Sequence, residues 1–322
     1  MKIKGFTYGY DGRAGAYRSE EAKQSRKRLF ETGVNWICLS FAVELDDIFS
    51  RQIRFRFGRD VSDRDLMAVI KDAHEHGVKV CLKPMVNSAD FIWRARITFP
   101  DADQEGKDRY WDEWFESYGA FMCYYAELAE ECGAEMLCIG CEMCGTEHKE
   151  AHWRTLIGRL RNIYHGELSY NTNHGHEDAI AWFDAVDYLG TSAYFPVGTE
   201  GKTGVEDMCA EWEKIKTELK ELVQKWNKPL LFMEIGCRSA KGCSSMPWDF
   251  EHRELPHDEE EQAAFYESCL RTFGSEEWFA GCFWWDWSTK IYDDEKTASE
   301  DNGFNIHLKK AEEVLKEWYA KL

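Results

Sequence analysis

The sequence has no long apolar run, no linker and no repeat. No stretch of the 322 residues is apolar over the length that crosses a bilayer, so we expect no membrane span. No Pro-, Gly- or Ser-rich segment separates two parts of the chain, and no self-similarity recurs at a period of about 20–50 residues. We therefore expect a single domain that covers residues 1–322.

Basic residues are too few for a polyanionic partner. The chain carries 59 acidic and 40 basic residues, a formal net charge of −19, and the basic residues are scattered along it. Nucleic acid and anionic membrane would be repelled at long range, so neither is expected as a partner. The N-terminus MKIKGFTYGYDG also lacks an apolar segment behind its lysines, so we expect no signal peptide and a cytoplasmic location.

Cysteine is abundant, with twelve residues. A cytoplasmic chain would keep them reduced, and several lie within apolar runs, where cysteine behaves as a small hydrophobic residue. The cysteines in apolar runs are Cys38, Cys81, Cys138 and Cys282. We expect most of the twelve to be buried free thiols.

Short apolar, β-rich runs alternate with longer segments of helical period. The eight predicted strands are Ile3–Tyr8, Trp36–Ala42, Val78–Met85, Glu135–Cys141, Leu168–Thr172, Tyr188–Tyr194, Pro229–Ile235 and Ala280–Trp285. The predicted helices are Ser19–Thr32, Ser62–His76, Trp111–Cys132, Glu150–Tyr164, Ala179–Ala185, Val205–Trp226, Glu259–Phe273 and Leu308–Lys321.

Eight strand-then-helix units predict an α/β fold of the (β/α)8 TIM barrel type, in which active sites lie at the C-terminal ends of the strands. A doubly wound sheet is the alternative. However, the first strand–helix turn, Gly9–Gly15, has no clean dinucleotide-binding fingerprint followed by a helix. The barrel is the favoured prediction.

Two glutamates, Glu142 and Glu234, directly close otherwise apolar strands, in MLCIGCE and PLLFME. With a side-chain period of two, Glu142 shares a strand face with Gly140, and Glu234 shares one with Leu230 and Phe232. The fourth and seventh strands lie across a barrel from each other. The two carboxylates are therefore predicted to face each other in the barrel mouth.

Facing carboxylates in an apolar, aromatic cleft suit glycoside hydrolysis. One donates a proton to the leaving oxygen and the other attacks the anomeric carbon, whereas a single glutamate at a strand end can equally be a solvated or salt-bridged residue. The 14 tryptophans favour sugar binding, since sugars stack on flat apolar faces. Trp285 and Trp287 are predicted to share the inward face of the eighth strand, and Trp93 lies in the loop after the third.

The strand-end motifs IGCE, MEIG and FWWDWS resemble those of the clan A retaining glycosidases. More narrowly, the chain resembles glycoside hydrolase family 113, whose members are β-1,4-mannanases and related enzymes. The resemblance runs nearly end to end, through GFTYG, LKPMVN, GTSAYFP and the C-terminal DNGFNIHLKKAEEVLKEWY. It implies a retaining hydrolase of β-1,4-mannosidic bonds, with a β-linked oligosaccharide or polysaccharide as substrate.

The resemblance also implies roles for individual residues. Glu142 would be the general acid/base, Glu234 the nucleophile, and Tyr194 would hydrogen-bond and orient Glu234. Trp285 would form the floor beneath the sugar. The residues placed around the sugar hydroxyls are Lys83, Asn171 and Asn173. Lys83 has a second interpretation, as an internal charge partner of one of the carboxylates.

Cys141 departs from the clan. Most of its members have asparagine directly before the acid/base, where it binds the 2-hydroxyl, and here that position is Cys141. Mannose presents its 2-hydroxyl axially, so the departure is compatible with mannan. Another β-linked hexoside, such as a gluco-oligosaccharide, stays open as the substrate because a few hydroxyl contacts set sugar identity.

Three other functions agree less well with the sequence. A metal site at Cys141, Cys144 and His148 is disfavoured because structural zinc usually has four ligands and no partner pair follows nearby. An aldolase-type barrel would use Lys83 as a Schiff-base lysine, but the eighth strand ends in tryptophan and not in a glycine loop that binds phosphate. A carbohydrate-binding pseudoenzyme is disfavoured by the presence of both glutamates. We expect no cofactor and no metal.

Overall fold

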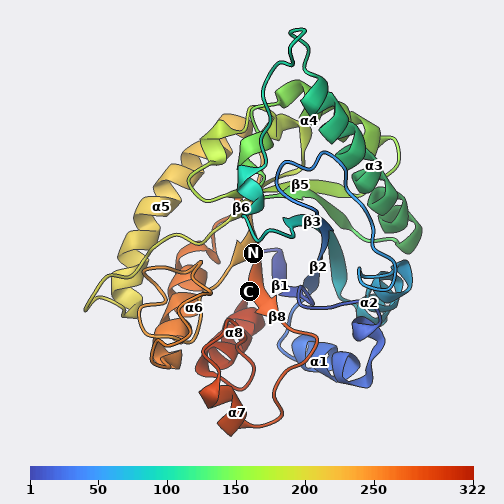
Figure 1. The fold of residues 1–322 in the computed structure, drawn as a ribbon. Coiled ribbons are helices and arrows are strands. Elements are labelled where there is room, and N and C mark those ends of the chain that lie inside the picture. The colour runs from blue at the N-terminus through green and yellow to red at the C-terminus, as the bar shows by residue number, and fades with distance from the viewer.

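The protein is a closed barrel of eight parallel strands, described by a computed structural model of residues 1–322 (Figure 1). Each strand pairs with its sequence neighbour, and β8 closes the barrel against β1. The strands are β1 (Ile3–Tyr8), β2 (Trp36–Leu45), β3 (Lys79–Ser88), β4 (Met136–Cys141), β5 (Glu167–Asn173), β6 (Tyr188–Ser192), β7 (Leu230–Ile235) and β8 (Phe279–Trp287). The predicted (β/α)8 fold is confirmed.

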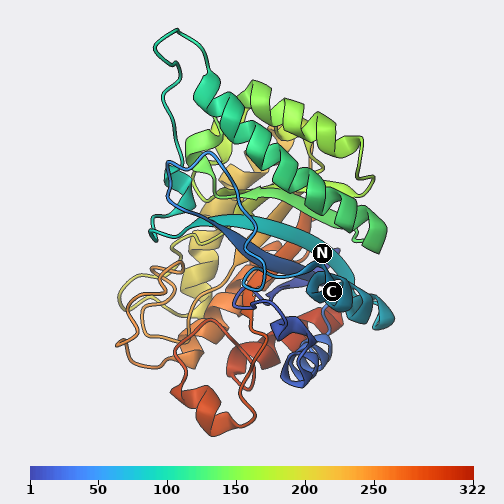
Figure 2. The same ribbon diagram turned by 45° about the vertical axis from the view of Figure 1, so that its right-hand side comes forward.

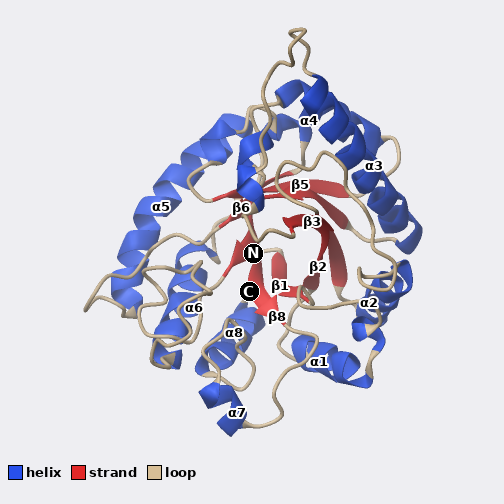
Figure 3. Cartoon of the chain, viewed as in Figure 1, coloured by secondary structure: helices blue, strands red, loops and turns tan.

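Helices surround the strands on all sides, as the colouring in Figure 3 shows. They are α1 (Glu20–Phe30), α2 (Asp63–Glu75), α3 (Arg109–Cys132), α4 (Glu150–Arg161), α5 (Val205–Trp226), α6 (Glu259–Phe273), α7 (Glu295–Glu300) and α8 (Lys310–Lys321). Helix α2 begins with a capping box, in which Ser62 and Asp65 satisfy each other's backbone N–H groups. The turned view of Figure 2 shows long loops gathered at one end of the barrel.

The predicted helix at Ala179–Ala185 is wrong. The connection from β5 to β6 holds two short 3-10 turns instead, Glu177–Ala179 and Phe183–Ala185. Trp182 and Phe183, adjacent in sequence, are both fully buried. Trp182 stacks on Trp153 of α4, with ring centroids 4.8 Å apart. Adjacent residues point about 100° apart on a helix, so burying both large rings favours an irregular connection.

Two apolar cores hold the barrel in place. The larger one, of 70 residues, fills the space between strands and helices. The smaller one fills the barrel interior with Ile3, Trp36, Cys38, Cys81, Met136, Cys138, Leu231, Met233, Ala280 and Phe283. All twelve cysteines are free, and the four predicted from apolar runs are buried, as expected. No helix combines the length and the apolar character that a membrane span needs.

Candidate active site

Glu234, near the C-terminal end of β7, is held by four side chains. Its Oε1 pairs with the ammonium of Lys83 and accepts hydrogen bonds from Asn171 Nδ2 at 3.2 Å and from the Cys141 thiol at 3.3 Å. Its Oε2 accepts a hydrogen bond from the Tyr194 hydroxyl at 3.0 Å. The donors come from β3, β4, β5 and the segment directly after β6, so four segments fix one carboxylate.

These contacts set the protonation state of Glu234. Burial alone would raise its pKa, but the Lys83 charge and hydrogen bond, together with the charge of Arg94, bring that pKa below its ordinary value. The Tyr194 hydroxyl is the reverse case: burial, and then the charges of Glu234 and Glu142, raise its pKa well above normal. At neutral pH Glu234 is therefore an anion, and Tyr194 is a protonated donor to it.

Glu142 follows β4 directly and has a left-handed backbone, with φ of 51°. Its backbone N–H donates to the carbonyl of Asn171 at 2.6 Å, and the side chain of the same Asn171 contacts Glu234. Its Oε2 accepts a hydrogen bond from Trp93 Nε1 at 3.1 Å and lies 3.5 Å from Arg94 Nη1. Trp93 keeps 45% of its surface exposed, whereas Glu142 is only 9% exposed, so a solvent-exposed ring holds a largely buried carboxylate.

The alternation proposed for β7 is wrong, although Glu234 does reach the mouth. Leu231 and Met233 fill the barrel interior, whereas Leu230 and Phe232 face the helices. Register shifts against both neighbouring strands fall between Phe232 and Ile235. These irregularities change the alternation and turn Glu234 inward.

The same kind of irregularity brings Cys141 into the mouth from β4. Cys138 points into the barrel, but a Cβ on Gly140 would meet Tyr170 and Trp153 in the outer layer. The register against β5 shifts between Cys138 and Cys141. Gly140 and Glu142 therefore do not share a simple inward face, and Glu142 enters the mouth through its left-handed backbone.

Trp285 and Trp287 at the end of β8 point in different directions. Trp285 is half-buried, and its ring centroid lies 4.8 Å from that of Tyr10. Trp287 is fully buried among the helix-facing residues, and its Nε1 donates to Ser25 on α1. The predicted shared orientation is wrong, and Trp287 lies outside the candidate site.

The two asparagines of β5 also differ. Asn171 is fully buried and acts on Glu234, while its Oδ1 accepts from Ser192 Oγ at 3.2 Å. Asn173 is half-buried, and its Nδ2 donates to the carbonyl of His174. Lys83 is buried as well, so the interpretation of Lys83 as a charge partner of a carboxylate is the one that matches the geometry.

The sequence matches the profile of Glycoside Hydrolase Family 113 over residues 6–309. The chain belongs to this family. It is therefore a glycoside hydrolase, and the resemblance drawn from its motifs is confirmed.

Solved structures agree with this assignment. A family 113 β-mannanase from Alicyclobacillus acidocaldarius, in complex with ManMIm, has a TM-score of 0.90 and 36% identity, covering 99% of this chain and 97% of its own. A family 113 β-1,4-mannanase has a TM-score of 0.90 and 34% identity over 100% of both chains. A β-glucuronidase from Ruminococcus gnavus shares the fold alone, at 12% identity and a TM-score of 0.64, with half of its chain covered. No curated protein matches the sequence.

Two charged residues of the candidate site are not among those predicted from the sequence. Arg94 contacts Glu142, and its place directly after Trp93 is the signal that could have identified it. Asp286 is half-buried beside Trp285, and burial, with the charges of Asp11, Asp301 and Glu234, raises its pKa to about 7. A carboxyl with such a pKa is partly protonated at neutral pH and can donate as well as accept a hydrogen bond.

Cys141, Cys144 and His148 do not converge on a metal site in this family 113 barrel. The Cys141 sulfur contacts Glu234 and Asn171, whereas His148 Nε2 lies 3.4 Å from Asp101 at the surface. The disfavoured cluster is therefore contradicted by the geometry.

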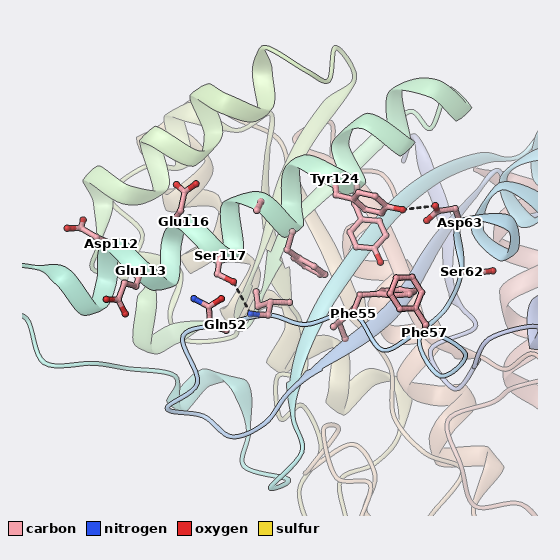
Figure 4. A pocket seen from close by; sticks show the side chains of 15 residues that line it. Gln52, Phe55, Phe57, Ser62, Asp63, Asp112, Glu113, Glu116, Ser117 and Tyr124 are labelled. Atoms are coloured by element: carbon pink, nitrogen blue, oxygen red, sulfur yellow. Dashed lines mark hydrogen bonds between the residues drawn. The ribbon is translucent and has the colours of Figure 1, made fainter.

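A groove of about 900 Å³ lies between the β2–α2 loop and α3 (Figure 4). Phe55, Phe57 and Tyr124 lie along it, and Tyr124 donates to Asp63 at 2.6 Å. None of its lining residues is among the predicted site residues of this family 113 chain. The two candidate glutamates are thus grouped at the strand ends and not in this groove.

Proposed function

We propose that this glycoside hydrolase cleaves β-1,4-mannosidic bonds with retention of configuration, using Glu234 as nucleophile and Glu142 as acid/base. The observation that carries the proposal is the environment of Glu234: a buried anion, oriented by Lys83, Asn171 and Tyr194. A nucleophile has to be ionised and aimed before substrate binds, because its reorientation would add to the barrier.

In the first step, Glu142 donates its proton to the glycosidic oxygen while a Glu234 oxygen attacks the anomeric carbon. The bond to the leaving sugar breaks, and a glycosyl ester of Glu234 forms. Tyr194 and Asn171 hold the attacking carboxylate. Trp93 and Arg94 donate toward Glu142 and stabilise its anion once the proton has left.

In the second step, water attacks the same carbon and releases Glu234 as the carboxylate. Glu142, now ionised, takes a proton from that water, so the enzyme returns to its starting state. Lys83 again pairs with the free Glu234 anion. Two displacements at one carbon leave the anomeric configuration unchanged.

Mannan as the substrate is supported by relatives of 34–36% identity, which are β-mannanases by name. Cys141, which stands where most clan members have asparagine, is compatible with mannan because mannose presents its 2-hydroxyl axially. Family membership gives no support to a Schiff-base role for Lys83, and the Lys83 ammonium forms an ion pair with Glu234. Another β-linked hexoside is the alternative outcome of the experiment that follows.

The decisive experiment incubates the protein with defined β-1,4-manno-, gluco- and xylo-oligosaccharides and follows the products by NMR at early times. We expect manno-oligosaccharides to be cleaved fastest and the first product to be the β-anomer. Release of the α-anomer would refute retention. Preference for gluco-oligosaccharides would refute the mannan assignment and leave the mechanism intact.

Tyr194→Phe is expected to lower kcat by about 10–100-fold, because it removes one hydrogen bond to a charged carboxylate, worth about 1.5–3 kcal/mol. The ring is buried and keeps its shape in the variant, so folding should be preserved. Steady-state kinetics with a manno-oligosaccharide checks this prediction. An unchanged kcat would show that Tyr194 does not orient Glu234 during turnover.

A further inference from the structure

Three potential metal ligands meet beside the mouth, outside the contacts of Glu142 and Glu234. They are Cys144 and Glu147, in the turn between β4 and α4, and His176, in the connection from β5 to β6. One ligand atom from each lies within 4.8 Å of the other two. The cluster is distinct from the disfavoured one, with which it shares only Cys144.

Glu147 has a carboxylate oxygen without a partner. Its side chain is 2% exposed, and its Oε1 accepts hydrogen bonds from Tyr170 at 2.8 Å and from Thr172 at 2.9 Å. Its Oε2 is buried and has no hydrogen-bond partner. One oxygen is thus fixed by neighbours, as carboxylate ligands of metals often are, while the other is left without a partner.

Neither protonation state of Glu147 resolves this by itself. An ionised carboxylate has no lysine or arginine in contact with it, and a protonated one leaves Oε2 without a partner whichever oxygen carries the proton. A cation beside Oε2 would satisfy this oxygen.

We propose that Cys144 Sγ, Glu147 Oε2 and a ring nitrogen of His176 form a three-ligand site for a divalent transition metal of the zinc class, with water as the fourth ligand. A thiolate, a carboxylate and an imidazole are the ligands that zinc takes in proteins, and hard ions such as Mg²⁺ and Ca²⁺ avoid sulfur. Ligand atoms in a tetrahedral zinc site lie about 3.3–3.6 Å apart, so the side chains need to close by about 1 Å.

The site has access to solvent and a rigid base. His176 is exposed and gives the metal a path of entry, while Glu147 and the half-buried Cys144 lie beneath it. Binding releases the thiol proton of Cys144 to solvent, since the thiolate is the ligand. The metal would link the turn that follows Glu142 to the loop after Asn173, and so stabilise this side of the mouth.

The test uses the full-length protein, stripped of metal with a chelator and titrated with Co²⁺ and then Zn²⁺. We expect one equivalent of Co²⁺ to give the intense visible bands of a tetrahedral site and a near-ultraviolet thiolate charge-transfer band, both removed by Zn²⁺. Cys144→Ser should abolish the near-ultraviolet band. His176→Ala should weaken Zn²⁺ binding at least about tenfold in competition with a chromogenic chelator.

Two matched variants serve as controls. His148→Ala removes a nearby surface histidine, and Cys209→Ser removes a half-buried thiol on α5; both should leave binding unchanged. His176 is exposed, so His176→Ala tests the site without changing a buried side chain. Absence of binding at micromolar metal, a Co²⁺ spectrum without the thiolate band, or equal affinity in His176→Ala would each overturn the proposal. Whether or not the protein binds the metal, the result does not test the proposed hydrolysis.

Discussion

Replacing Glu234 with alanine is expected to lower kcat by at least about 10⁴-fold, because no neighbouring group can replace an oriented anionic nucleophile. Adding azide should restore turnover and yield a glycosyl azide of the α configuration, since azide enters from the face that the carboxylate leaves open. Steady-state kinetics and NMR of the product check both parts.

Glu135→Gln is the matched control for this variant. Glu135 lies directly before β4, at the opposite end of the barrel from the mouth, and accepts a hydrogen bond from the backbone of Val80. The Glu135→Gln variant should keep full activity. Azide products of the β configuration, or substantial turnover by Glu234→Ala without azide, would assign the nucleophile elsewhere.

Lys83→Met is expected to destabilise the fold by about 3–5 kcal/mol, because it leaves the buried Glu234 carboxylate without its cation. It should also move the acidic limb of the pH–rate profile upward. In the native protein the pKa of Glu234 is lowered, so the anion persists until pH falls through that lowered value. Without Lys83 the pKa rises, and activity is lost at higher pH. Chemical denaturation and the pH dependence of kcat/KM measure the two effects.

Lys309→Met provides the comparison. Lys309 is also buried and paired with a carboxylate, Asp301, at 2.9 Å, but it does not contact Glu234. It should destabilise the protein and leave the acidic limb where it is. An acidic limb that stays in place in Lys83→Met would mean that Lys83 does not control the protonation of Glu234.

The sequence predicts the barrel well because every strand is a compact apolar run and all but the fifth are followed by a clear helical segment. The predicted ends of the strands are less accurate, since β2 and β3 each continue three residues beyond the predicted Ala42 and Met85. The prediction of a helix at Ala179–Ala185 fails because both Trp182 and Phe183 are buried. Trp182 packs against Trp153 of α4, a long-range contact that local periodicity does not indicate.

The two glutamates are found from sequence for a reason that is only partly correct. Their places at the ends of β4 and β7 bring them to the same end of the barrel, but the simple alternation behind that prediction does not hold. Bulges depend on pairing with neighbouring strands and leave no clear mark in a single sequence. The same limit explains the error at Trp287, and it explains why the contacts of Lys83 and Asn171 with Glu234 become visible only in the fold.

At position 142, the residue that favours stability differs from the one that the proposed reaction needs, because Glu142 has a left-handed backbone. For most residues this conformation costs about 1 kcal/mol or more, whereas glycine, which has no Cβ, and asparagine adopt it more readily. A library screened for heat resistance alone would therefore tend to replace Glu142, and the surviving variants would have lost their proposed proton donor. Substitutions meant to stabilise the enzyme should therefore leave Glu142 unchanged and be made in the larger core between strands and helices.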